Sequence, residues 1–334
     1  MPEGVPEGSR GPILAHAPRD AENLRPMPPA DGPFATRTIE EVAAFWDRRP
    51  CNVRHSLREP GTREYFDEVE RRKYLVEPHI PAFAEFSRWR GKRVLEVGCG
   101  IGTDTMNFAR NGARVTAVDI SAASLSLARK RAEIFGIAEA IDFRLANAED
   151  LGRHVPIEPY DLVYAFGVVH HTPNPKAAIR SMRAYMDDAS VMKLMVYSRL
   201  SLKVLEIAAS RLLDRPWEVD RHVAERSEAQ TGCPVTYTYT RRTLARLLEG
   251  LTATRIFKTH VFPYVVADYV RHVHRLRPIF RAMGPRLFKR LESVAGWHLC
   301  VDARLAEGGP SAPCGNDAAT STESFQRTRE ERIP

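Results

Sequence analysis

Residues 94–102, VLEVGCGIG, decide the fold of this chain. An apolar run ends in glycines at every second position, Gly98, Gly100 and Gly102, and a helical pattern follows over 101–112. Glycine is needed where the chain turns sharply and where the backbone must approach a ligand closely. This stretch therefore predicts a buried strand, a ligand-binding turn and a helix.

The same alternation of strands and helices continues toward the carboxyl end. Short apolar runs predict strands, and amphipathic segments between them predict helices, which together indicate a parallel sheet with right-handed crossovers. The predicted strands lie at 93–99, 113–121, 142–148, 160–171, 191–198, 252–262 and 297–305. We expect a doubly wound α/β fold with a mostly parallel seven-stranded sheet and an antiparallel last strand.

The segments around this core predict one domain over 37–305, with its core at 90–200. The pattern of 38–49 predicts a helix with Thr38 as its N-cap, and 61–86 predicts one or two helices broken near Pro78 and Pro81. Two insertions interrupt the alternation and are expected to form a lid: 199–240 and 262–296. Residues 1–36 and 306–334 are rich in small and polar residues and are expected to be disordered tails.

The spacing of the glycines bears on the ligand. A dinucleotide fingerprint requires G-x-G-x-x-G, and Thr103 stands where its last glycine would be. The pattern is instead E-x-G-x-G-x-G, beginning at Glu96. The next strand ends in Asp119-Ile120, and a carboxylate at this place can accept hydrogen bonds from ribose hydroxyls. The alternatives are a tight turn of another α/β fold and an N-cap aspartate.

The ends of two further predicted strands also carry residues that bear on the ligand. The third strand ends at Asn147-Ala148, where an amide oxygen can accept a hydrogen bond from an adenine amino group. The fourth ends in FGVVHH, residues 166–171. With the glycine pattern and Asp119, these motifs resemble those of class I (Rossmann-like) S-adenosylmethionine (SAM)-dependent methyltransferases. The resemblance covers about 90–200 and is closest to small-molecule methyltransferases of quinone biosynthesis.

This resemblance implies SAM as cofactor. The residues that match the family's cofactor motifs are Glu96, Gly98, Gly100, Gly102, Asp119, Ile120, Asn147 and Ala148. Asn147 departs from the pattern, because the family often has aspartate there. The N-P-P-Y motif of enzymes that methylate amide or exocyclic nitrogens is absent after the fourth strand, which argues against DNA adenine or glutamine as acceptor.

Candidate catalytic and acceptor residues follow the strands. His170 and His171 stand at the carboxyl end of the fourth strand, where α/β sheets bind ligands, and either could act as a base or only pack there. Tyr197 is a candidate for the pocket wall. The segment 227–240 predicts a binding lid or else a connector packed on the sheet edge, and its candidate acceptor residues are Glu228, Gln230, Tyr237 and Tyr239.

Composition limits the possibilities that remain for metal binding, location and acceptor. The 334 residues have a normal hydrophobic fraction of 43% and five scattered cysteines without metal-binding spacing, so we expect free thiols and no metal. The start lacks a signal-peptide pattern, which predicts a cytoplasmic protein. The net charge of +7 is spread along the chain. We expect a small-molecule acceptor, with an RNA or tRNA methyltransferase or an idle partner-binding subunit as alternatives. The intact glycine pattern argues against an idle subunit.

Overall fold

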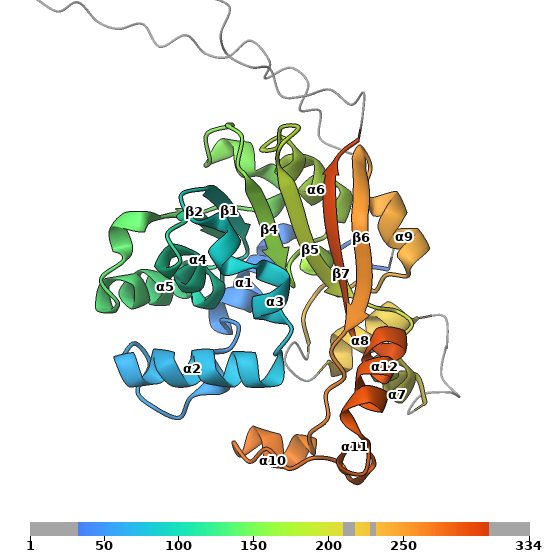
Figure 1. The fold of residues 1–334 in the computed structure, drawn as a ribbon. Coiled ribbons are helices and arrows are strands. Elements are labelled where there is room, and N and C mark those ends of the chain that lie inside the picture. The colour runs from blue at the N-terminus through green and yellow to red at the C-terminus, as the bar shows by residue number, and fades with distance from the viewer. Residues whose placement is uncertain (1–32, 210–217, 228–231, 307–334) are drawn as a thin grey trace, which may run out of the picture.

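A single seven-stranded sheet organises the molecule (Figure 1). The structure is a computed structural model, and it describes residues 33–209, 218–227 and 232–306. The sheet order is β3-β2-β1-β4-β5-β7-β6. The strands are β1 Arg93–Val97, β2 Arg114–Asp119, β3 Ile141–Leu145, β4 Leu162–Phe166, β5 Val191–Tyr197, β6 Leu251–Thr259 and β7 His298–Leu305.

The direction of the strands confirms the predicted fold class. Strands β1 to β5 pair in parallel, and β7 runs antiparallel between β5 and β6. Every residue of β5 is buried, as expected for a central strand covered on both faces. Because β7 is antiparallel, its first residue lies at the same end of the sheet as the carboxyl ends of β4, β5 and β6.

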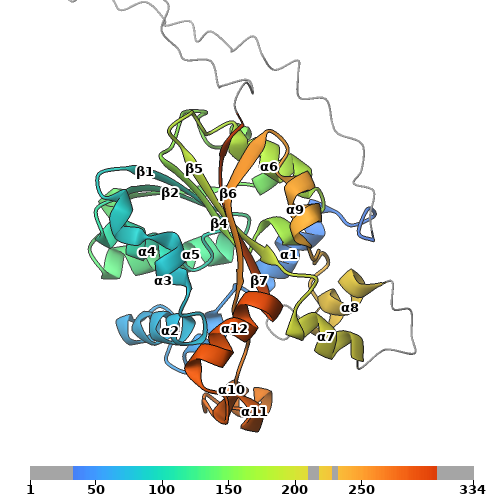
Figure 2. The same cartoon turned by 45° about the vertical axis from the view of Figure 1, so that its right-hand side comes forward.

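Helices cover both faces of the sheet (Figure 2). On one face lie α4 (Thr103–Arg110) and α5 (Ala122–Ile134), and on the other lie α6 (Pro175–Arg183) and α9 (Arg241–Leu247). Successive side chains of β4 enter opposite cores: Leu162 and Tyr164 pack in one hydrophobic cluster, and Val163 and Ala165 in the other. This alternation is the period-two geometry of a strand buried on both faces.

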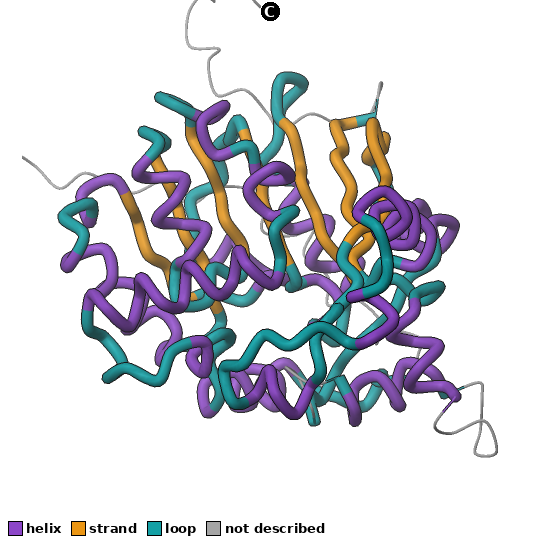
Figure 3. The backbone as a smooth tube through the Cα atoms, turned by 60° about the horizontal axis from the view of Figure 1, so that its bottom comes forward, coloured by secondary structure: helices purple, strands orange, loops and turns teal. Residues whose placement is uncertain are grey.

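The carboxyl edge of the parallel strands is covered by segments outside the regular alternation. In Figure 1, helices and loops lie below the ends of the strands, and Figure 3 brings this side forward. The N-terminal helices are α1 Ile39–Arg48, α2 Arg63–Val76 and α3 Ile80–Ala84. The later helices are α7 Leu202–Ala209, α8 Val219–Arg226, α10 Val266–Val270, α11 Pro278–Arg281 and α12 Pro285–Ala295. Among the described residues, no helix is long and apolar enough to cross a membrane.

The N-terminal segment confirms two predictions and corrects one. Thr38 caps α1 through a capping box with Glu41, and 61–86 forms two helices separated around Pro78. The tail predicted over 1–36 reaches too far, because Phe34 is buried and its ring meets that of Tyr237 at 5.1 Å. A lone aromatic residue among prolines and glycines gives no periodic signal. Residues 1–32 and 307–334 lie outside the described residues.

The end of the fourth strand also differs from its prediction. Strand β4 ends at Phe166, and His170 and His171 lie in a short 3-10 turn, Val169–His171. Gly167 adopts a positive φ of 81° and turns the chain after the strand. The apolar run through Val168 and Val169 concealed this turn in the sequence.

Candidate active site

A cavity of about 680 Å³ lies at the carboxyl edge of the sheet. Its walls include the glycine turn after β1, the ends of β2 to β5, the N-terminal helices α1 and α2, and the junction between β6 and β7. Ligand pockets generally measure about 300–1,000 Å³. The cavity is therefore of the size that holds small molecules.

The glycine turn is held by backbone hydrogen bonds to β2. The amides of Gly98 and Cys99 donate to the Val118 carbonyl at 2.7 and 2.9 Å. A Cβ on Gly98 would lie 2.1 Å from a Val168 methyl, so packing requires glycine there. Around Gly100, which lines the cavity with φ +54°, no atom lies within 4 Å of the position of a Cβ. Gly100 thus leaves room for a ligand to approach the backbone.

Asp119 lies beside this opening. Its carboxylate accepts from the Gly100 amide at 2.7 Å and from the Ser121 amide at 2.9 Å, one bond to each oxygen. Each oxygen keeps lone-pair capacity for a further donor. Burial raises the pKa of Asp119, and the three backbone amides of Ser121, Gly100 and Ile120 counteract that rise. Asp119 and Ile120 both line the cavity, as cofactor-binding residues would.

Two of the predicted cofactor residues do not line the cavity. Glu96 is buried and accepts a hydrogen bond from the Thr105 hydroxyl at 2.6 Å, so its carboxylate holds the start of α4. Burial, with a contribution from nearby Asp104, raises the pKa of Glu96 to about 8. Gly102 packs against Ala128 of α5, where a Cβ would lie 3.2 Å from the Ala128 methyl. Both residues therefore stabilise the turn without lining the cavity.

Asn147 and Ala148 line the cavity beyond β3. The Asn147 side-chain oxygen accepts from the Glu149 amide at 3.0 Å and caps the 3-10 turn Ala148–Arg153. One lone pair of this oxygen is therefore already used. An adenine contact through Asn147 stays a prediction.

The two candidate catalytic histidines have different surroundings. His171 lines the cavity, and its Nδ1 lies 2.9 Å from the Val235 carbonyl. A carbonyl only accepts, so Nδ1 carries the proton and Nε2 is the acceptor. Burial lowers the pKa of His171 to about 4, which keeps the ring neutral at neutral pH. His170 does not line the cavity, and both its ring nitrogens are buried without a hydrogen-bond partner.

Of the predicted acceptor residues that the structure describes, only Tyr197 lines the cavity. Tyr197 lines the cavity and stacks on Trp297 with ring centroids 4.0 Å apart. Tyr237 and Tyr239 do not line the cavity and pack with the hydrophobic cluster beneath α6 and α9. Their backbone amides donate to the carbonyls of His170 and Tyr197, so this stretch runs along the strand ends as a connector. Glu228 and Gln230 lie outside the described residues.

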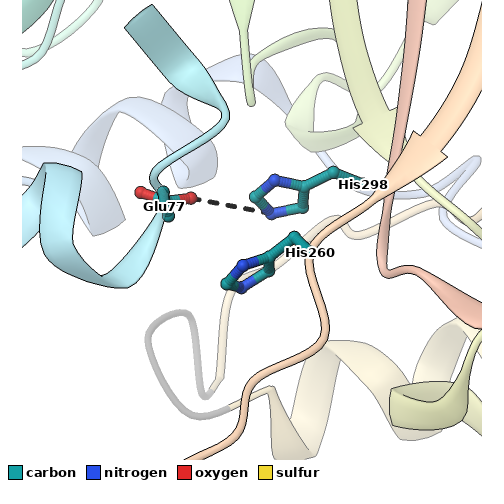
Figure 4. Close-up of side chains that lie close together, drawn as sticks. All are labelled: Glu77, His260 and His298. Carbon is teal, nitrogen blue, oxygen red and sulfur yellow. Dashed lines mark ion pairs between the residues drawn. The ribbon is translucent and has the colours of Figure 1, made fainter. Parts of the chain in front are cut away.

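One group of cavity residues was absent from the predicted site. Glu77, His260 and His298 each offer a ligand atom, and these atoms all lie within 4.8 Å of one another (Figure 4). Burial raises the pKa of Glu77 to about 7 and lowers that of His260 to about 4. The three residues come from the end of α2, the end of β6 and the start of β7. No local spacing in the sequence reveals such a group, and the sequence predicted no metal.

The fold and the cavity define a class of protein. A parallel sheet with an antiparallel β7, a glycine turn after β1 and a carboxylate at the end of β2 are the features of class I SAM-dependent methyltransferases, whose cofactor is SAM. The sequence model of a family described as "Methyltransferase domain" matches residues 69–254, more than half of the chain. The chain therefore belongs to this methyltransferase-domain family.

Individual relatives match shorter stretches. The ubiquinone biosynthesis O-methyltransferase of Actinobacillus pleuropneumoniae serotype 5b is 35% identical over 105 residues, 30% of this chain and 44% of the relative. The enzyme of the same name from Pseudomonas savastanoi pv. phaseolicola is 36% identical over 91 residues, 27% of this chain and 38% of the relative. The chain thus spans less than half the length of these relatives.

Two solved methyltransferase structures align with this chain at low sequence identity. A SAM-dependent methyltransferase from Mesorhizobium loti is 19% identical, with a TM-score of 0.47, over 68% of this chain and 97% of the other. A geranyl diphosphate C-methyltransferase from Streptomyces coelicolor is 15% identical, with a TM-score of 0.49, over 83% of this chain and 100% of the other.

Proposed function

We propose that this protein transfers the methyl group of SAM to an oxygen, nitrogen or carbon atom of a small-molecule acceptor, in secondary-metabolite or quinone-like biosynthesis. One observation carries the proposal: the glycine turn with Asp119 and the polar residues at the β6–β7 junction line the same cavity. A cofactor and an acceptor can therefore lie in one cavity. The names of the ubiquinone biosynthesis relatives support an oxygen acceptor on a quinone-like ring.

The residues around the cofactor would bind and orient it. Bound SAM would supply a methyl group activated by its sulfonium; the acceptor atom would bond to the methyl carbon in line as the carbon–sulfur bond breaks and S-adenosylhomocysteine leaves. The Asp119 carboxylate would accept from the ribose hydroxyls, and Gly100 would leave room for the amino-acid part. Proximity and alignment of the reactants can supply about 7–11 kcal/mol of the barrier. The main task of the cavity is therefore to position the acceptor and to exclude water.

His171 is the better placed of the two predicted bases. Its ring lines the cavity, and its Nδ1–H bond to the Val235 carbonyl fixes Nε2 as the acceptor nitrogen. Its low pKa favours accepting a hydrogen bond from a hydroxyl over holding a free proton. His171 would orient a hydroxyl acceptor and take its proton only as the methyl transfers.

A labelling experiment tests the proposal. Purified protein is incubated with methyl-labelled SAM and either a small-molecule extract or total tRNA, and the label is followed by chromatography. We expect labelled small molecules that disappear with Asp119→Ala. Label only in the tRNA would overturn the small-molecule acceptor, and no label in either fraction despite SAM binding would favour an idle subunit.

A further inference from the structure

We propose that Glu77, His260 and His298 bind a divalent first-row transition-metal ion, and that this ion holds an oxygen atom of the acceptor. The second part rests on the proposed function, and the first does not. All three residues line the cavity, so an ion bound by them would face the space left for the acceptor.

The distances between the ligand atoms suit one ion bound by all three residues. His298 Nε2 lies 3.6 Å from Glu77 Oε1, too far for a hydrogen bond. Two ligand atoms that each lie about 2.1 Å from a tetrahedral ion are about 3.4 Å apart. This pair is thus already separated as ligands would be. The His260 ligand atom lies within 4.8 Å of both, near enough to complete a set of three ligands when an ion draws the side chains together.

His298 is oriented by a second histidine. Its Nδ1 lies 2.9 Å from Nε2 of His79, which comes from the turn before α3. This contact turns the other nitrogen, Nε2, toward Glu77 (Figure 4). Histidine ligands of metals generally use their second nitrogen in such a hydrogen bond, which fixes the tautomer and the ring orientation.

The backbone holds His260 and His298 together. His260 has a left-handed φ of 68°, which is costly for a residue other than glycine and often occurs at functional sites. Its carbonyl accepts from the Trp297 amide at 2.8 Å, directly before His298. A Cβ on Gly296 would lie 2.4 Å from the Thr259 carbonyl oxygen, so only glycine allows this close crossing. The two histidines are therefore presented from a rigid junction.

The charge around Glu77 leaves a role for a cation. The nearby Lys73 ammonium is paired with Asp104 at 2.7 Å. A carboxylate in a largely buried setting is costly without close compensation. Two imidazoles and one carboxylate suit zinc, iron, cobalt or manganese better than magnesium or calcium, which prefer oxygen ligands alone. Three protein ligands leave open positions, as in catalytic metal sites.

Cobalt(II) provides a direct test, because its visible absorption reports coordination without any turnover. Untagged full-length protein, stripped of metal, is titrated with Co²⁺ alone. We expect one equivalent to bind with a visible band that Zn²⁺ displaces. His298→Asn retains a nitrogen that can bond His79 and removes Nε2, and Glu77→Gln retains the shape and removes the charge. We expect each to weaken Co²⁺ binding at least 100-fold.

Controls separate loss of the site from loss of the fold. His154 is exposed and lies outside the cavity, so His154→Ala should bind Co²⁺ like the wild type. Calorimetric SAM binding by each variant shows that it is folded. A wild-type protein that binds no Co²⁺ at micromolar concentrations would overturn the site, and so would unchanged Co²⁺ binding by both site variants.

Turnover then tests the acceptor contact separately. Loss of methyl transfer on chelation and its return with Zn²⁺ or Co²⁺ would support that contact. Full activity in stripped protein would overturn it and leave the proposed function standing. Metal binding by a protein that methylates no acceptor would overturn the proposed function and the acceptor contact, and would support the ion site alone.

Discussion

At the scale of single residues, Asp119 is bonded to the glycine turn, and we propose that it also binds the ribose of the cofactor. We expect Asp119→Ala to weaken SAM binding by at least tenfold, because a hydrogen bond to a charged group contributes about 1.5–3 kcal/mol. Calorimetry measures this change. Since Asp119 also accepts from Gly100 and Ser121, Asp119→Asn serves as the milder second variant, with an intermediate loss. Unchanged SAM affinity in both variants would refute the ribose assignment.

The two adjacent histidines allow a paired prediction. In His171→Asn the side-chain amide can replace Nδ1 as donor to Val235 while Nε2 is lost. We expect turnover to fall about 10²–10⁴-fold with SAM affinity retained, if the acceptor is a hydroxyl. His170→Phe keeps a ring against Tyr197 and removes two buried unpaired nitrogens, so turnover should be retained. Steady-state kinetics would contradict the assignment if His170→Phe were the inactive variant.

At the scale of elements, the turn from β1 to α4 depends on glycine for two separable reasons. Gly98 lies in this turn, and Gly136, which follows α5, serves as a comparison. Both have positive φ, +76° and +67°, but only at Gly98 would a Cβ meet a neighbour. Gly136→Ala should therefore cost only the left-handed conformation, roughly 1–2 kcal/mol. Gly98→Ala should cost a further 1–3 kcal/mol or so for the overlap with Val168. Chemical denaturation of the two variants measures the difference, and equal losses would contradict this account.

Sequence patterns predicted the elements well where burial is continuous. The strands β1, β2 and β5 follow from apolar runs bounded by glycine or polar residues, and Asp119 follows from its place at a strand end. The turn at Gly167 was missed because the apolar residues continue past it. The sequence left open whether the tyrosines of 227–240 belong to a lid or to a connector, because composition cannot distinguish a lid from a connector that packs on a core.

The cluster of Glu77, His260 and His298 could not be predicted in the same way. It depends on which residues of β6 and β7 lie opposite one another, and that register places Thr259 beside His298. It also depends on how the end of α2 meets the sheet. Both are set by packing between segments far apart in the chain, which leaves no trace in local spacing.

At the scale of the whole molecule, buried histidines make stability depend on pH. Burial lowers the pKa of His55 to about 3 and of His171 to about 4, and lowers that of His170 well below its usual value. A lowered folded-state pKa gives stability that is present above about pH 6.5 and is lost as the pH falls toward the folded pKa. Protonating these groups therefore requires exposing them.

Two buried carboxyl groups act in the opposite direction. Glu77 and Glu96, with pKa values raised to about 7 and 8, contribute stability below about pH 4.5 that is lost as the pH rises through those values. Burial also lowers the pKa of His79, His260 and His298. These six histidines outnumber the two carboxyls, so unfolding takes up protons on balance, at about 1.4 kcal/mol per proton and pH unit. We expect denaturation in the metal-free protein to show lower stability at pH 4.5 than at 6.5. His170→Phe should flatten this dependence, and an unchanged slope would contradict it.

The antiparallel β7 has a consequence for how the protein is made. The elements that shape the cofactor half of the cavity, β1 to β5, are complete once residue 197 has been synthesised. Among the described residues, the strand that is made last, β7, lies directly against β5. The nascent chain therefore has its cofactor motifs well before His298 joins them, and the junction of β6 and β7 can complete the cavity wall only after residue 298 has been synthesised.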